Sequence, residues 1–292
     1  MHPILTRLLE EAPVITDGAW GTQLQERGLP VGSAPDPWNL THPDIVLQVA
    51  RAYVEAGSRI ILTNTFGASR ITLERHGLAN EAEKINRAGA EISRKAAADR
   101  ALVFGSIGPT GKLVAMGEIS ADDAAAAFEE QVAGLASGGV DGFVIETMSD
   151  LEEAALAVRC AAATGLPVVA CMTYGAGKSG DRTIMGTTPE QAAEGLLTAG
   201  AHIVGTNCGH GPAAMRPIVA RLRKATGRPI WAKPNAGLPT MVDGRAVYQQ
   251  TPEAFVEEAV GLVEAGAGFV GGCCGTGPEF IRGLVGRLKR GD

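Results

Sequence analysis

The sequence is poor in several features that would mark other classes of protein. Only 4% of its 292 residues are aromatic, and 26 basic residues stand against 32 acidic ones, for a net charge of −6. This balance gives no basic surface for nucleic acid. No apolar run approaches the roughly 20 residues of a membrane-spanning helix, and the first residues lack the apolar stretch of a secretory signal. We therefore expect a cytoplasmic protein that contacts neither nucleic acid nor a membrane.

Cysteine is also scarce. The five cysteines are too few, and odd in number, for a disulfide scaffold, and in a cytoplasmic protein they are expected to stay reduced. Apolar residues and glycine are plentiful, at 45% of the chain and 39 residues respectively. So much apolar sequence excludes a disordered chain, and the many glycines are typical of tight turns between helices and strands.

Eight short apolar runs recur along the chain and are separated by helical patterns. Their starts lie roughly 25 to 45 residues apart, which is the spacing of strand–helix units. Most are continuously apolar, as parallel strands covered on both faces are. Eight such units predict a single closed (β/α)8 TIM barrel over residues 1–292, in preference to an open doubly wound sheet. The expected strands are 14–17, 59–64, 101–108, 142–147, 167–174, 202–208, 230–235 and 268–274.

The ends of several helices can be predicted from local signals. Ser149 and Thr188 each stand three residues before a Glu or Gln, which predicts two capping boxes. Glycines that precede expected strands are predicted to end helices in the left-handed conformation; they are Gly57, Gly138, Gly200 and Gly266. Two longer stretches, 105–121 and 174–188, are expected to be loops that cover one face of the barrel.

Three of the cysteines fall at the ends of expected strands. Cys208 ends the sixth strand, and Cys273 and Cys274 end the eighth within a glycine-rich bend. In a TIM barrel the active site lies at these C-terminal ends, and three converging thiolates suit a zinc ion with one open position. Cys160 and Cys171 are instead expected to be small buried residues. His210 is a weaker alternative ligand.

Acidic residues and a glycine-rich loop occupy other strand ends. Asp17 ends the first expected strand and Glu146 ends the fourth, so that their carboxylates could pair with the ammonium of a ligand. The loop Asp17-Gly-Ala-Trp-Gly-Thr22 offers backbone N–H groups to an anion. These residues predict a pocket for a zwitterionic ligand beside the cysteines.

The motifs together resemble the homocysteine S-methyltransferase family, and most closely the homocysteine-binding module of cobalamin-dependent methionine synthases. The similarity spans nearly the whole chain in order. The cysteine set is its most specific part, while the glycine motifs are less so. The matching stretches are Asp17-Gly-Ala-Trp-Gly-Thr22, Leu62-Thr-Asn-Thr-Phe66, Gly105-Ser-Ile-Gly-Pro-Thr-Gly111, Glu146-Thr147, Ser149-Asp150, Gly205-Thr-Asn-Cys208, Pro234-Asn-Ala-Gly237 and Gly271-Gly-Cys-Cys-Gly-Thr276.

This resemblance implies a zinc enzyme that methylates homocysteine to methionine, with Cys208, Cys273 and Cys274 as zinc ligands. Asp17 and Glu146 would hold the substrate ammonium. Further substrate contacts are expected from the backbone around Ala19, Trp20, Gly21 and Thr22, which would hold the carboxylate, and from Asn64 and Asn235. Asn235 is also the candidate zinc ligand in the absence of substrate. Trp20 departs from the usual residue of the family and is expected to shape the pocket wall.

The methyl donor is less constrained by the sequence. Only eighteen residues follow Cys274, so a separate methylcobalamin-carrying protein is the expected donor, as in a split methionine synthase. S-methylmethionine or a betaine-like onium compound is the alternative, and Trp38 and Phe66 are the residues expected on the donor side. Gly67 stands where betaine-using relatives tend to carry tyrosine.

Two interpretations from other classes stay open. The chain could bind zinc and homocysteine without turnover, as a subunit of an assembly. It could also be a barrel lyase or aldolase, for which Lys233 is the strand lysine nearest a suitable position for a Schiff base. The sequence leaves open the oligomeric state and whether another thiol or a selenol is accepted.

Overall fold

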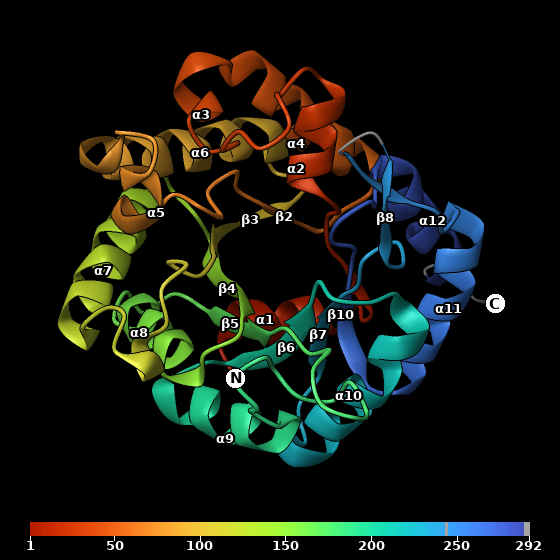
Figure 1. Ribbon diagram of the computed structural model, residues 1–292. Coiled ribbons are helices and arrows are strands. Elements are labelled where there is room, and N and C mark those ends of the chain that lie inside the picture. The colour runs from red at the N-terminus through yellow and green to blue at the C-terminus, as the bar shows by residue number, and fades with distance from the viewer. Residues whose placement is uncertain (243–244, 289–292) are drawn as a thin grey trace.

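The computed structural model describes residues 1–242 and 245–288, and these form a barrel of eight parallel strands (Figure 1). Around the barrel the order is β1-β10-β7-β6-β5-β4-β3-β2. A parallel bridge between Thr16 and Ile60 brings the two ends of this order together. The predicted (β/α)8 barrel is therefore confirmed. Its strands are β1 (Val14–Ile15), β2 (Ile60–Leu62), β3 (Leu102–Ile107), β4 (Gly142–Met148), β5 (Val168–Met172), β6 (Ile203–Asn207), β7 (Ile230–Lys233) and β10 (Ala267–Val270).

Each predicted strand is present, and each is buried on both faces. Side chains that point inward form a cluster in the barrel in which Trp231 lies 5.3 Å from the ring of Phe269 and 6.4 Å from that of Phe104. Leu5 of α1 (Pro3–Leu9) packs into the same cluster from the N-terminal side. This packing closes the bottom of the barrel, so that the C-terminal ends of the strands form its only mouth among the described residues.

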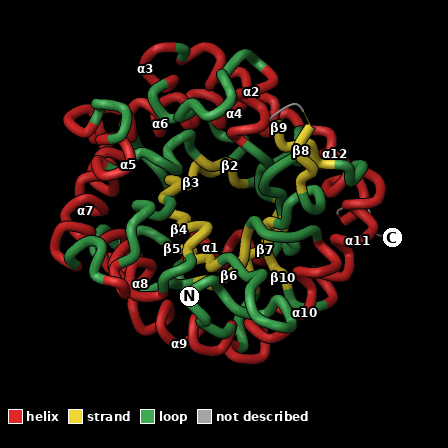
Figure 2. Tube along the Cα trace, in the orientation of Figure 1, coloured by secondary structure: helices red, strands yellow, loops and turns green. Residues whose placement is uncertain are grey.

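Helices surround the strands, as Figure 2 shows in red around yellow. Their apolar faces and the outward faces of the strands form one large buried cluster. In the described chain, no helix combines the length and apolar character that crossing a bilayer requires. The longer helices are α4 (Pro43–Ala56), α6 (Ala82–Ala97), α7 (Ala121–Ser137), α8 (Leu151–Ala162), α9 (Pro189–Ala199), α10 (Pro212–Thr226), α11 (Pro252–Glu264) and α12 (Pro278–Leu288); the short ones are α2 (Trp20–Glu26), α3 (Trp38–Thr41) and α5 (Arg70–Glu74).

One of the two predicted capping boxes is correct. Thr188 caps α9, and the Thr188 and Gln191 side chains each bond the other's backbone N–H. Ser149 does not cap α8. The N-cap is Asp150, whose carboxylate accepts a hydrogen bond from the Glu152 N–H at 2.9 Å. A carboxylate one residue closer to the helix displaces the serine, since both side chains compete for the same free amides.

The glycine predictions hold at Gly57, Gly200 and Gly266, which have φ of 101°, 114° and 109°. Gly138 is the exception, because its φ is −79° and the following Gly139 takes the left-handed conformation instead. A Cβ at Gly138 would lie 2.5 Å from the Cβ of Ala90 on α6. This glycine is thus required by the close packing of two helices.

The loops at the mouth differ partly from the prediction. The first residues of the expected loop 105–121 belong to β3, which continues to Ile107. The loop over 174–188 is confirmed and carries a bridge between Ala176 and Arg182. An antiparallel hairpin of β8 (Pro239–Val242) and β9 (Arg245–Tyr248) follows β7 and was not predicted.

Asp36 gives the fold a specific pH dependence. It lies in the loop before α3, is 2% exposed, and accepts a hydrogen bond from the Gly67 N–H at 2.9 Å. Burial raises the pKa of Asp36 from 3.8 to about 6. The folded protein therefore binds this proton more tightly than the unfolded chain does. Protonation of Asp36 therefore stabilises the folded state. This stabilisation is complete below pH 3.8 and is lost as the pH rises through 6.

Asp36→Asn keeps an acceptor for the Gly67 N–H but removes the ionisation. We expect the unfolding free energy of the variant, relative to wild type, to rise by about 2 kcal/mol between pH 4 and pH 7. Urea denaturation of both proteins across this range measures the difference. A constant difference would contradict the assignment.

Candidate metal centre and substrate pocket

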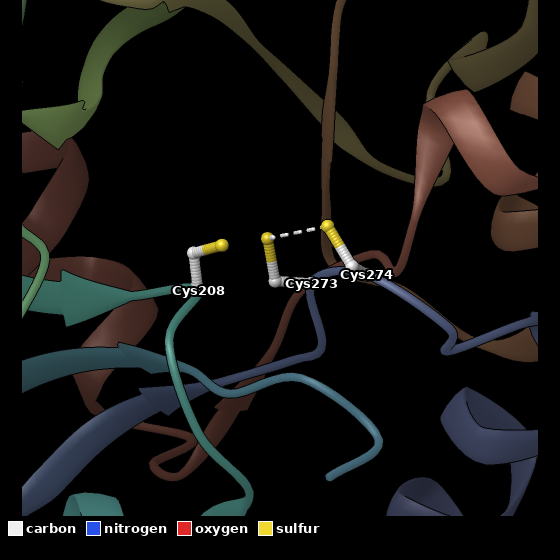
Figure 3. A group of neighbouring side chains, drawn as sticks. All are labelled: Cys208, Cys273 and Cys274. Atoms are coloured by element: carbon white, nitrogen blue, oxygen red, sulfur yellow. Dashed lines mark hydrogen bonds between the residues drawn. The ribbon is translucent and has the colours of Figure 1, made fainter. Parts of the chain in front are cut away.

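Three cysteine side chains meet at the mouth of the barrel. Cys208 follows β6, Cys273 and Cys274 follow β10, and Figure 3 shows their sulfurs turned toward the same space. The three Sγ atoms all lie within 4.8 Å of one another, and those of Cys273 and Cys274 are 4.0 Å apart. Tetrahedral zinc with Zn–S bonds of about 2.3 Å needs sulfurs about 3.8 Å apart. The cluster therefore has dimensions that suit a zinc ion.

The backbone around the cluster explains how two adjacent cysteines reach one point. A Cβ on Gly271 would clash with Thr16 Oγ1, and a Cβ on Gly272 with Thr276 Oγ1. The chain thus turns against its neighbours where no side chain fits. Cys208 has φ of 62°, the left-handed region, which a non-glycine residue seldom adopts. The predicted glycine-rich bend is present, and this backbone strain is added to it.

The charge of the cluster also favours a cation. Hydrogen bonds from Cys273 and then Cys274 lower the pKa of Cys208, while their interactions with Cys208 raise the pKa values of Cys273 and Cys274. Without a metal, these contacts therefore favour ionisation of Cys208 over ionisation of Cys273 or Cys274. Three thiolates at this spacing need a positive ion between them, and soft sulfur ligands are those that zinc binds well.

The remaining cysteines and His210 lie apart from this arrangement. Cys171 is buried in β5, and Cys160 on α8 is directed at the carbonyl of Ala125 at 3.7 Å. Within the described residues, the one group of potential metal ligands contains Cys208, Cys273 and Cys274 and leaves out His210.

A pocket of about 350 Å³ opens beside the cluster. This volume suits a small molecule. The residues predicted for substrate and donor contacts that line it are Ala19, Trp20, Gly21, Thr22, Asn64, Phe66 and Glu146; the other lining residues are Gly18, Pro35, Leu62, Thr63, Thr65, Ser106, Thr147, Cys208, Lys233, Gly272, Cys273 and Cys274.

Asp17 lies beneath the pocket wall. It is fully buried, and its Oδ1 pairs with the Lys233 ammonium at 2.5 Å. Its Oδ2 accepts hydrogen bonds from the Leu62 N–H at 2.7 Å and from Trp20 Nε1 at 2.8 Å. Both oxygens of Asp17 are thus engaged by the protein, in contrast to the expectation that Asp17 contacts a ligand ammonium.

Glu146 remains the carboxylate that faces the pocket. Its Oε1 accepts from Ser106 Oγ at 2.5 Å and its Oε2 from Asn207 Nδ2 at 3.2 Å. Burial raises the pKa of Glu146, and Lys233 and Ser106 act against this rise. Burial removes the water that would stabilise the charged form of Glu146. A cationic group of a ligand would stabilise that charged form instead.

Lys233 is poorly suited to form a Schiff base. Burial alone would lower the pKa of its ammonium, but Asp17 and Glu146 outweigh burial and raise it. A nucleophilic lysine needs a lowered pKa. The electrostatics of this site therefore argue against the lyase alternative.

Three of the predicted residues contact other parts of the protein, and Asn64 does so while it lines the pocket. Asn64 Nδ2 donates to the Pro35 carbonyl at 2.9 Å, and Asn235 Nδ2 donates to the Gly209 carbonyl at 2.9 Å while its Oδ1 accepts from Cys274 N at 3.1 Å. Trp38 is outside the pocket lining, because its ring stacks on His42 at 4.3 Å. These side chains shape loops and support the cysteines in this structure.

Sequence reasoning missed two side chains that bond Glu146. Ser106 and Asn207 both lie at the mouth ends of strands inside matched motifs, but neither received a role. A polar residue at the last inward position of an apolar strand is the signal that would have found them.

Comparisons with known proteins agree with the geometry. The sequence model of the family described as homocysteine S-methyltransferase matches residues 14–288. Methionine synthase of Mycobacterium leprae is 31% identical over 311 residues, and that of Mycobacterium tuberculosis 31% over 308. These alignments cover 99% and 98% of this chain and 26% of each relative. The chain thus spans about a quarter of the length of these curated relatives.

Solved structures share the fold. The homocysteine methyltransferase MmuM of Escherichia coli, in its metallated form, has a TM-score of 0.81 at 22% identity, with 97% of this chain and 99% of that chain covered. The carboxyl transferase domain of Rhizobium etli pyruvate carboxylase has a TM-score of 0.55 at 15% identity, with 99% and 52% covered. At these identities the likeness shows the barrel alone.

Proposed function

The chain belongs to the homocysteine S-methyltransferase family, and from this premise we propose that it methylates the sulfur of homocysteine with the help of a zinc ion held by Cys208, Cys273 and Cys274. The observation that carries the proposal is a pocket of small-molecule size with three converging thiols in its wall. Zinc, when bound, would lower the pKa of a coordinated thiol from about 8.5 and so supply a thiolate at neutral pH.

The protein's own residues would orient the amino-acid end of the substrate. Glu146 is placed to accept the substrate ammonium, with Ser106 and Asn207 fixing its two oxygens. The backbone of Ala19–Thr22 lines the pocket at the start of α2. The Ala19 N–H donates to the Thr276 carbonyl, whereas the first amides of the helix, from Trp20 on, have no side-chain cap and are available to a carboxylate. Lys233 and Asp17 would keep the pocket floor rigid, and the Lys233 ammonium would offset part of the negative charge of the thiolates.

We further propose that the methyl group comes from a separate corrinoid-carrying protein. Apart from Met1, every large exposed apolar side chain of the described residues lies on the loops and the hairpin of the barrel mouth. We call these residues the apolar rim, and a rim of this kind favours a macromolecular donor over a small one. Its members are Val31, Phe66, Met116, Ile184, Leu238, Met241, Val242 and Val247.

A small onium donor has weaker support. Such a cation is bound best by a cage of aromatic faces. Within the described chain, the aromatic residues that line the pocket are Trp20 and Phe66, and the Trp20 Nε1–H is bonded to Asp17. Trp38, the other expected wall, packs on His42 instead.

A donor screen tests the proposal. Zinc-loaded protein is incubated with homocysteine and with either methylcobalamin-loaded corrinoid protein, S-methylmethionine or betaine, and methionine is quantified. We expect turnover with the corrinoid protein. Turnover with a small donor alone would replace the proposed donor but retain methyl transfer. Binding of homocysteine without methionine from any donor would instead favour a non-catalytic subunit.

A further inference from the structure

We propose that Asn207 is a positioning residue that couples the ammonium site of homocysteine to the thiol cluster through a single amide group. This inference rests on the proposed function, because it concerns how Glu146 is presented to the substrate. Asn207 ends β6 directly before Cys208, and its side chain is completely buried between β4 and the mouth of the barrel.

The hydrogen bonds of Asn207 fix the orientation of its amide. Its Oδ1 accepts from the Thr147 N–H at 2.7 Å, and a backbone N–H can only donate. Its Nδ2 therefore faces the opposite side, where it donates to Thr147 Oγ1 at 2.7 Å. The same nitrogen lies 3.2 Å from Glu146 Oε2 and 4.0 Å from Cys273 Sγ. Because the NH₂ group has two protons and one is directed at Thr147 Oγ1, the second is shared between the carboxylate proposed to bind the substrate and a candidate metal ligand.

The contact with Thr147 has a structural purpose. Thr147 has φ of 60°, and a β-branched residue in the left-handed region is strained by about 1–3 kcal/mol. Two bonds from one Asn207 side chain hold this conformation. Because Thr147 directly follows Glu146, the strained backbone sets the direction in which the Glu146 carboxylate leaves the strand.

Two consequences follow for the site. Glu146 has one oxygen held by Ser106 and the other by Asn207, so that its carboxylate is orientated before the substrate arrives. The Asn207 donor also faces the thiol of Cys273, where a hydrogen bond stabilises the thiolate form. A single substitution at Asn207 should therefore alter both the affinity for homocysteine and the electronic state of the Cys273 sulfur.

Asn207→Asp separates this role from a purely structural one. The aspartate retains an acceptor for the Thr147 N–H, and the Thr147 hydroxyl can turn to donate to its second oxygen. Only the donation to Glu146 and Cys273 is lost and replaced by repulsion. With the zinc-loaded protein we expect the homocysteine Kd, measured by calorimetry, to rise about 10- to 100-fold while zinc stoichiometry is unchanged.

Two further readouts sharpen the test. In a double-mutant cycle with Glu146→Gln, the effect of Asn207→Asp should shrink, because the introduced amide can donate to the introduced carboxylate. In the cobalt-substituted protein, the thiolate-to-metal charge-transfer band should shift to lower energy when the hydrogen bond to Cys273 is removed. Asn86→Asp is the matched control, since Asn86 is equally buried but bonds the Ala68 and Ala82 carbonyls on and beside α6. It should leave homocysteine affinity and the band unchanged.

Other results would overturn the inference. The first is a homocysteine Kd of Asn207→Asp that stays within twofold of the wild-type value. The second is a double-mutant cycle in which the effects of Asn207→Asp and Glu146→Gln on this Kd simply add. The third is loss of zinc from Asn207→Asp, which would assign Asn207 to the metal site alone. Asn207→Ser is the second variant if the aspartate does not fold, with the same rise in Kd expected. Failure of the wild type to bind homocysteine would overturn the proposed function, whereas wild-type binding with an unaffected variant would overturn this inference alone.

Discussion

Alanine at Cys273 is expected to lower zinc affinity by more than about a hundredfold and to abolish measurable methyl transfer. Residues that only support a metal ligand already contribute about 10- to 100-fold in affinity or activity, and Cys273 is itself a member of the thiol cluster. It is fixed in place by a hydrogen bond from its N–H to the Pro234 carbonyl at 2.7 Å. Its removal leaves two sulfurs, which is fewer than a catalytic zinc site requires from the protein. Cys208→Ala and Cys274→Ala should behave alike.

Zinc content after dialysis against a weak chelator, together with methionine formation, measures the effect. Cys160→Ala is the matched control, because Cys160 is a partly buried cysteine of α8 outside the cluster. This control should retain zinc and activity. Full zinc and full turnover in any one of the three cluster variants would contradict the assignment of the site.

The fold could be predicted well because its strands are defined by composition. Continuous apolar runs located all eight strands, yet the ladders are shorter than the runs. Asn64, Asn235 and Cys274 lie beyond the last paired residue, where the chain bends toward the mouth. Gly105 was expected both in a strand and at the start of a loop; it lies in β3, where a Cβ would lie 2.8 Å from Leu135 and glycine allows the close approach of α7. Sequence alone does not distinguish a glycine needed for packing from one needed for a turn.

The site was predictable in its residues but less so in their pairings. The cysteines were found because their residue type and strand-end position together restrict the chemistry. The partner of Asp17 was not found, because Lys233 is 216 residues away and reaches it only across the closed barrel. The β8–β9 hairpin was missed for a different reason: the residues of β8 are all exposed, so no burial pattern marks it.

Lys233→Met is expected to destabilise the fold by about 3–5 kcal/mol, the usual cost of leaving one member of a buried ion pair alone. The side chains of Lys233 and Asp17 are 3% and 0% exposed, and their charged atoms lie 2.5 Å apart. Without the ammonium, Asp17 retains hydrogen bonds from Leu62 N and Trp20 Nε1 but no positive charge. Because Asp17 is held against β2 and α2, its unpaired charge destabilises the region where the barrel closes.

The same reasoning predicts how the pair responds to removal of both charges. Asp17→Asn alone leaves the ammonium unpaired and should cost a similar amount, whereas the double variant leaves no buried charge and should be clearly more stable than the sum of the two single effects predicts. Urea denaturation of the four proteins at pH 7 measures this coupling. Arg87→Met is the control, since Arg87 and Glu91 form a pair at 3.0 Å with side chains 60% and 55% exposed; it should cost less than about 1 kcal/mol. If the losses of unfolding free energy in the two single variants add in the double variant, or if the single variants are as stable as the Arg87→Met control, the burial of Lys233 and Asp17 does not depend on their pairing.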